Sequence, residues 1–162
     1  MIYTALTNRA MKLAYTAHHG QVDHGGAPYI FYPIYLAEQM TDEVSACVAL
    51  LHDVVEDTVV TLEDLRREFP PEITEPVRLL THTDSVDYFD YVRALKESGV
   101  ARRVKLADLR HNSDETRLAE VQMTEEERGF WKAKYQKARE ILEEADKGPF
   151  SGALGGKWGG ME

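Results

Sequence analysis

The sequence has a single cysteine and an excess of acidic over basic residues. Cys47 cannot form an internal disulfide, and its apolar surroundings at 44–51 predict a buried thiol. Lys and Arg number 19 against 28 Asp and Glu, which gives a formal net charge of −9. This charge disfavours polymeric nucleic acid and anionic membranes as partners. A small anionic substrate would need a bound cation or converging basic side chains to offset the repulsion.

Long apolar runs are also missing. None approaches the roughly 20 residues that span a bilayer, and the segment MIYTALTNRAMKLAY lacks the apolar core of a signal peptide, so we expect a cytoplasmic protein. The 162 residues fit one domain, which we place at 1–147. A glycine-rich tail at 148–162 follows, because its few apolar groups cannot offset the entropy of ordering it. The sequence leaves the oligomeric state open.

Apolar residues recur at helical spacing, and no segment alternates as a strand would. We expect an all-α bundle with helices over 7–19, 33–40, 44–55, 61–69, 72–81, 87–98, 101–114 and 125–145. The segment 44–55 is apolar nearly all round, which predicts a central buried helix. Asp42, Thr61 and Thr124 predict helix N-caps, and Gly99 is expected to close the helix at 87–98.

Ionisable side chains end the otherwise apolar segment 44–55. His52 and Asp53 supply one nitrogen and one oxygen donor, which suits Mn²⁺, Fe²⁺ or Zn²⁺ better than Ca²⁺. Glu56 and Asp57 lie one turn further on, where they can position or deprotonate an attacking water. A His–Asp dipeptide alone would be equally well explained as a helix-end cap or an ion pair.

A second polar group lies in the apolar segment 104–112. Asp108 has no obvious local structural purpose there, which makes it a third candidate metal ligand. Asn112, Lys105 and Arg110 also stand out, whereas a solvated helix face accounts for the other charged residues nearby.

Three blocks in this order resemble the hydrolase domain of the RelA/SpoT family, in the HD superfamily. They are residues 17–21 with 26–30, the HD-x-x-ED pattern within 49–58, and the aspartate motif at 104–112. The resemblance implies an HD-domain helical bundle and a metal-dependent phosphohydrolase that acts on a nucleotide. The most specific enzyme that the resemblance implies is a (p)ppGpp 3′-pyrophosphohydrolase, whose substrate is guanosine tetraphosphate or a close relative.

The resemblance also implies roles for individual residues. A single divalent ion, usually manganese, would be held by His52, Asp53, Asp108 and a fourth ligand. Glu56 and Asp57 would be the catalytic acids. Asn112 would lie near the nucleotide sugar, with Lys105 and Arg110 as weaker candidates for phosphate contact.

The chain departs from the family pattern at the fourth ligand. Where the family reads Pro-Tyr-Ile-x-His-Pro, residues 28–33 read PYIFYP, so Tyr32 replaces the expected histidine. A phenol, whose ordinary pKa is about 10, binds a divalent ion well only when it is deprotonated. Tyr32 should therefore be a poorer ligand, which puts metal affinity and activity in question. His18 or His19 is the alternative nitrogen ligand.

A second departure concerns the substrate. Asp23 and His24 stand where the related alarmone hydrolases carry basic residues, which weakens the assignment of a guanosine alarmone. Two alternatives therefore stay open beside the alarmone hydrolase. One is a catalytically weakened, nucleotide-binding regulatory protein, and the other is an HD-type nucleotidase.

Overall fold

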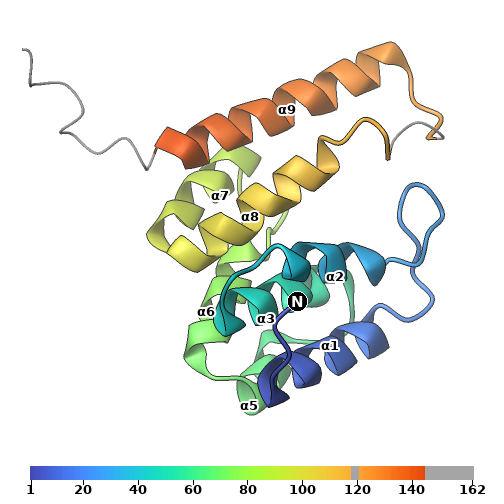
Figure 1. The fold of residues 1–162 in the computed structure, drawn as a ribbon. Coiled ribbons are helices and arrows are strands. Elements are labelled where there is room, and N and C mark those ends of the chain that lie inside the picture. The colour runs from blue at the N-terminus through green and yellow to red at the C-terminus, as the bar shows by residue number, and fades with distance from the viewer. Residues whose placement is uncertain (118–120, 145–162) are drawn as a thin grey trace, which may run out of the picture.

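A computed structural model describes residues 1–117 and 121–144, and every regular element within them is a helix (Figure 1). The predicted all-α fold is confirmed; within these ranges Val22 and Pro28 form only an isolated bridge. None of these helices is long and apolar enough to cross a membrane. The expected tail at 148–162 lies outside the described residues. The elements are α1 (Ala5–Ala17), α2 (Phe31–Glu38), α3 (Glu43–Leu51), α4 (Val54–Asp57), α5 (Leu62–Glu68), α6 (Pro71–Leu80), α7 (Tyr88–Ala94), the 3₁₀ helix η1 (Leu95–Glu97), α8 (Gly99–Asn112) and α9 (Glu125–Glu143).

Side-chain caps begin several of these helices, as the sequence predicts. The carboxylate of Asp42 accepts a hydrogen bond from the Ser45 amide at 2.8 Å, and Thr61 and Thr124 each form a reciprocal capping box. The prediction for Gly99 is wrong, because this glycine is the first residue of α8. The Ser98 hydroxyl accepts from the amide of the third residue of α8 and so starts a new helix there.

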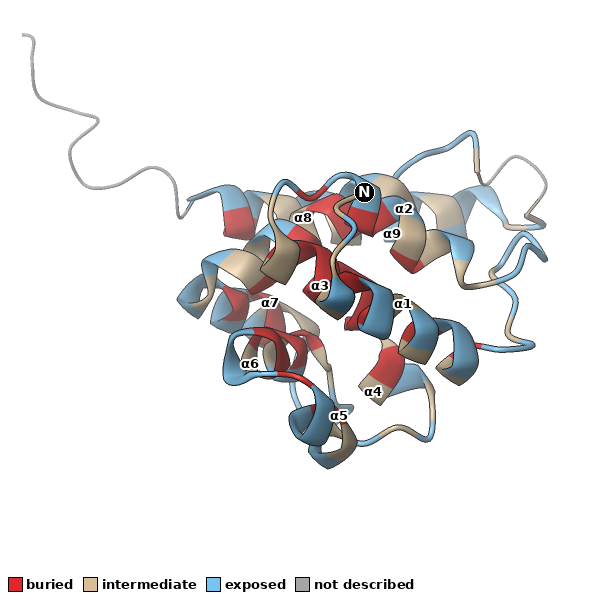
Figure 2. Ribbon diagram, turned by 60° about the horizontal axis from the view of Figure 1, so that its bottom comes forward, coloured by how far each residue is buried: buried red, intermediate tan, exposed pale blue. Residues whose placement is uncertain are grey.

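Helix α3 is the centre of the bundle. It packs against α1, α2, α6 and α8, and its residues 45–51 are all buried (Figure 2). Cys47 is among them, as expected, and burial raises the pKa of its thiol to about 12. The sequence predicted a continuous helix over 44–55, but α3 ends at Leu51 and the chain turns at His52 and Asp53 before α4. His52 Nδ1 lies 2.8 Å from a backbone carbonyl three residues earlier, and such local bonds compete with the helical ladder.

Helices α8 and α9 run side by side along the bundle (Figure 1), and α8 also contacts α2, α3 and α6. This packing places the polar face of α8 opposite the turn that follows α3. The two polar groups that the sequence singles out, although far apart in the chain, therefore share one region of the molecule.

The central position of α3 generates a stability prediction. Leu50 is fully buried, so Leu50→Ala should lower the free energy of unfolding by about 2–5 kcal/mol through lost transfer energy and a residual cavity. Val59, which is 96% exposed, is the matched control, and Val59→Ala should cost less than about 0.5 kcal/mol. Urea unfolding followed by circular dichroism measures both. Equal losses in the two variants would contradict the assigned core.

Candidate functional site

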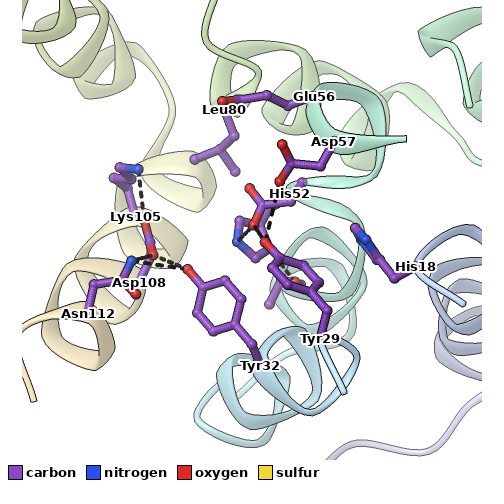
Figure 3. Close-up of polar contacts among 12 residues, drawn as sticks. His18, Tyr29, Tyr32, His52, Glu56, Asp57, Leu80, Lys105, Asp108 and Asn112 are labelled. Atoms are coloured by element: carbon purple, nitrogen blue, oxygen red, sulfur yellow. Dashed lines mark hydrogen bonds and ion pairs between the residues drawn. The ribbon is translucent and has the colours of Figure 1, made fainter. Parts of the chain in front are cut away.

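The two polar groups predicted from sequence meet at one cavity of about 490 Å³ (Figure 3). The turn after α3 contributes Asp53, and α8 contributes Lys105, Asp108 and Asn112. Helix α2 adds Tyr32, and the loop before it adds Tyr29. Residues 22–25 of the same loop also line it, and later segments complete the lining with Arg117, Val121, Met123, Trp131 and Tyr135.

Buried His52 and partly buried Asp53 form a pair at the end of α3. His52 Nδ1 lies 2.8 Å from the Ala49 carbonyl, and its Nε2 lies 2.9 Å from Asp53 Oδ2. The geometry of this second contact does not make a hydrogen bond, so Nε2 is a buried atom without a hydrogen-bond partner. Burial disfavours both charges, but the Asp53 carboxylate raises the pKa of His52 to about 9. His52 in turn holds the pKa of Asp53 down at about 2.

The Tyr29 phenol lies between two carboxylates. It donates to Asp53 Oδ2 at 2.5 Å, and it also reaches Asp57 Oδ2 at 3.4 Å. Burial, followed by the charge of Asp53, raises the pKa of Tyr29, which keeps the phenol protonated as a donor. Burial and the same neighbouring charge raise the pKa of Asp57. Asp53 and Asp57 are therefore linked through one hydroxyl group.

Two residues of the segment 17–21, His18 and Gln21, contact Tyr29 and the backbone of Asp57 and so support this link. Gln21 donates from Nε2 to the backbone carbonyl of Asp57 at 2.9 Å, and its Oε1 lies 2.8 Å from His18 Nδ1. The His18 ring also packs on Tyr29, with centroids 4.7 Å apart. His18 and His19 line a separate apolar cavity and not the one that holds Asp108. The structure thus gives His18 a supporting position.

Asp108 has three partners, two of them on its own helix, although the sequence showed no obvious local structural purpose for it. Lys105 Nζ lies 2.7 Å from Oδ2, Asn112 donates to Oδ1 at 2.5 Å, and the Tyr32 hydroxyl donates to the same oxygen. Lys105 and Asn112 lie three positions before and four after Asp108, which puts all three on one face of α8. Burial opposes the charge on Lys105, but Asp108 raises the pKa of its ammonium well above the usual value.

Tyr32 is held in place by aromatic packing as well as by Asp108. Its ring stacks on His111 with centroids 4.9 Å apart and an interplanar angle of 16°, and Tyr35 packs against the same imidazole. Burial and the charge of Asp108 raise the pKa of the Tyr32 phenol well above its ordinary value, so it acts as a protonated donor. Burial and the charge of Arg117 lower the pKa of His111 to about 4. Sequence reasoning did not single out His111, although it directly precedes Asn112.

Two predicted site residues, Glu56 and Arg110, do not line the larger cavity. Glu56 lines a smaller, neighbouring cavity, where its Oε2 accepts from the His82 amide at 2.8 Å; burial raises the pKa of Glu56. Arg110 is exposed and lines neither this cavity nor the larger one. The predicted role of Arg110 in substrate binding thus has no support from its position.

Sequence reasoning missed Arg117. Its guanidinium lies 3.2 Å from Asp23 Oδ2, and both residues line the larger cavity. Asp23 is the acid that stands where related hydrolases carry a basic residue. Its ion-pair partner lies 94 positions later in the chain. No local pattern could reveal that pairing.

The donor atoms fit a divalent cation only in part. Within 1–117 and 121–144, no three His, Cys, Asp or Glu side chains are grouped so that they could hold a metal ion. His52 Nε2, which is buried and makes no hydrogen bond, and the adjacent Asp53 Oδ2 would offer a nitrogen and an oxygen donor once His52 has lost its proton. Both oxygens of Asp108 are engaged by other donors. The three-ligand site therefore stays a prediction.

Comparison with known families agrees with this arrangement. A family model described as an HD domain matches residues 10–125. The chain belongs to the HD-domain family. HD domains are metal-dependent hydrolases, which supports a hydrolase that uses a divalent metal ion, and the blocks that resemble RelA/SpoT lie within the matched residues.

Curated relatives place this HD domain near the alarmone enzymes. The chain is 35% identical over 148 residues to a GTP pyrophosphokinase of Streptomyces coelicolor, covering 83% of this chain and 16% of that protein. It is 32% identical over 121 residues to the guanosine-3′,5′-bis(diphosphate) 3′-pyrophosphohydrolase of Borreliella burgdorferi, covering 64% and 18%. The chain therefore spans less than a fifth of the length of these relatives.

A solved structure matches nearly the whole fold. It is a metazoan ortholog of SpoT described as hydrolysing ppGpp, with a TM-score of 0.69 and 26% sequence identity. The match covers 91% of this chain and 97% of that one. The RelA/SpoT-like HD hydrolase fold predicted from the sequence is confirmed.

The buried pair of Lys105 and Asp108 generates a stability prediction. Lys105→Met should lower the free energy of unfolding by about 3 kcal/mol, at the lower end for a broken buried pair because Tyr32 and Asn112 still bond Asp108. Adding Asp108→Asn should recover part of this loss, since the unpaired charge is then gone. As a control, Arg66→Met breaks only exposed ion pairs and should cost less than about 1 kcal/mol. Chemical unfolding of the four proteins tests this, and a double variant no more stable than Lys105→Met would contradict the pairing.

Proposed function

We propose that this HD domain is a metal-dependent phosphohydrolase acting on a nucleotide, with a (p)ppGpp-like 3′-pyrophosphate ester as its leading candidate substrate. The observation that carries the proposal is the meeting of Asp53, Lys105 and Asp108 at one cavity, with Glu56 and Asp57 on the adjoining helix. The names of the Borreliella burgdorferi relative and the metazoan structure support the substrate class.

The cation would be held by His52, Asp53 and Asp108, and Mn²⁺ is the ion we propose because a mixed imidazole and carboxylate set suits it. When bound, a divalent cation supplies a Lewis acid for a phosphoryl oxygen and makes water a better nucleophile. Asp108 would exchange its contact with the Lys105 ammonium for the cation, which leaves that ammonium free to meet the substrate.

The other residues have separable tasks. Asp57 and Glu56 have raised pKa values, which suits carboxylates that take a proton from an attacking water and hold it. Lys105 brings positive charge to phosphate within an acidic protein, and Asn112 offers an amide close to Asp108. The rings of Trp131 and Tyr135 give the same cavity apolar surface on which a base can pack.

One observation favours a second function, a nucleotide-binding regulatory protein without turnover. Tyr32 takes the place of the expected histidine and donates its proton to Asp108, a bond that competes with metal. Against this, a pure binder of phosphates has no need for Glu56 and Asp57, which repel the ligand. We therefore put the enzyme first.

The proposed activity predicts release of phosphate or pyrophosphate from a nucleotide. Purified protein with Mn²⁺ should hydrolyse at least one member of a panel containing ppGpp, GTP, GDP and nucleoside monophosphates. Asp53→Asn should reduce turnover by at least about 100-fold, since it removes a charged ligand. Circular dichroism checks that this variant is folded. If neither wild type nor Tyr32→His hydrolyses any nucleotide, the protein is not this enzyme.

Tyr32→His tests the departure from the family pattern. The substitution adds an imidazole ligand and removes the phenol bound to Asp108, so Mn²⁺ affinity should rise at least about 10-fold, together with turnover. Calorimetric titration measures the affinity. Tyr35→His is the matched control, because Tyr35 packs against the same imidazole, does not line the cavity, and should change neither quantity.

Two outcomes would change the interpretation. If Tyr32→His binds Mn²⁺ tightly but hydrolyses nothing, the pocket has a binding role. If wild type already binds Mn²⁺ as tightly as the variant, Tyr32 does not weaken the metal site.

A further inference from the structure

A second cavity adjoins the one described above. It has a volume of about 230 Å³, and Asp53 and Lys105 line both cavities, so the two meet at these side chains. Glu56, His82 and Lys134 line only the smaller one. Its volume lies below the roughly 300–1,000 Å³ typical of sites for drug-sized ligands. A small group attached to a larger ligand suits it better than a whole nucleoside.

Lys134 brings a cation from α9 to this cavity. Its Nζ lies 4.0 Å from the centroid of the Tyr88 ring and 4.8 Å from that of Trp131. In the part of the chain that the structure describes, no carboxylate lies within ion-pair distance of this ammonium. Burial and the nearby charge of Lys105 lower the pKa of Lys134. Two aromatic rings position the ammonium without neutralising it, so its hydrogen-bond donors remain available to an anion.

Opposite charges line opposite sides of this cavity. Asp53 and Glu56 come from the turn after α3 and from α4, while Lys105 and Lys134 come from α8 and α9. Both acids are already engaged, Asp53 by the Tyr29 phenol and Glu56 by a backbone amide. Lys105 and Lys134 bring two ammonium groups to a lining that also contains His52 and His82. Of the two ammonium groups, only Lys134 has no carboxylate to neutralise it.

We propose that the smaller cavity is a phosphate subsite, in which Lys134 together with Lys105 binds the pyrophosphate part of the substrate while the nucleoside lies in the larger cavity. This assignment rests on the proposed function for the identity of the substrate. With its oxygens facing the two ammonium groups, the phosphate would expose its phosphorus atom toward Asp53 and Glu56. The attacking water would lie on that side. Lys134 then sets the preference for substrates that carry a phosphate chain.

Binding of inorganic pyrophosphate to the metal-free full chain tests the subsite directly. Calorimetric titration in the presence of a chelator should show that Lys134→Ala weakens binding about tenfold, as expected for the loss of a charge-assisted contact. Lys134→Arg should retain most of the affinity. Lys137→Ala is the matched control, since Lys137 lies on the same helix with its Nζ 4.1 Å from the Phe89 ring but does not line the cavity.

The outcomes separate this inference from the proposed function. If wild type does not bind pyrophosphate, or binds it as Lys134→Ala does, the subsite is wrong whether or not a nucleotide is hydrolysed. Equal weakening by Lys134→Ala and Lys137→Ala would also overturn it, because a general loss of positive charge would then explain the effect. A selective loss at Lys134 in a protein that hydrolyses no nucleotide would support the subsite and reject the enzyme.

Discussion

A buried carboxylate must be matched by donors, and Asp108 imposes this requirement at the centre of the site. Lys105 and Asn112 donate to this carboxylate from the same face of α8, and Tyr32 donates to it from α2. Satisfying one carboxylate therefore ties α2 to α8 beside the end of α3. The walls of the larger cavity depend on this tie, because Tyr32, Lys105 and Asn112 all line it.

The apolar packing of α3 determines the electrostatics of the acids that follow it. The helix is buried along 45–51, so the turn at its end begins in a dry environment. There His52 holds the pKa of Asp53 low, whereas partial desolvation and the charge of Asp53 raise the pKa values of the more exposed Glu56 and Asp57. One carboxylate is kept charged beside two that take up protons more readily. Separation of this kind suits a site that divides charge stabilisation from proton transfer.

The sequence predicted what local chemistry encodes, and it missed what depends on docking between distant helices. Helical spacing and cap residues such as Thr61 and Thr124 predicted the fold and several helix starts. The sequence did not predict the end of α3 at Leu51, because a continuous apolar run has no periodicity that marks where the helix stops. The sequence also did not predict that Asp23 pairs with Arg117 or that α9 lines the cavities. Periodicity shows which face of a helix is apolar, but not which other helix packs against that face.

The acidic net charge makes the local placement of cations decisive. Arg117 is matched by Asp23 and Lys105 by Asp108, so each of these cations has a carboxylate beside it before any ligand arrives. Lys134 is held by aromatic rings instead. A phosphate group entering the site would thus meet one ammonium that no neighbouring acid offsets, in the cavity that Asp53 and Glu56 also line. Cation binding at Asp108 would release a second, because the ion and Lys105 compete for the same carboxylate. If a cation binds there, metal occupancy and phosphate affinity would rise together, although the protein as a whole repels anions.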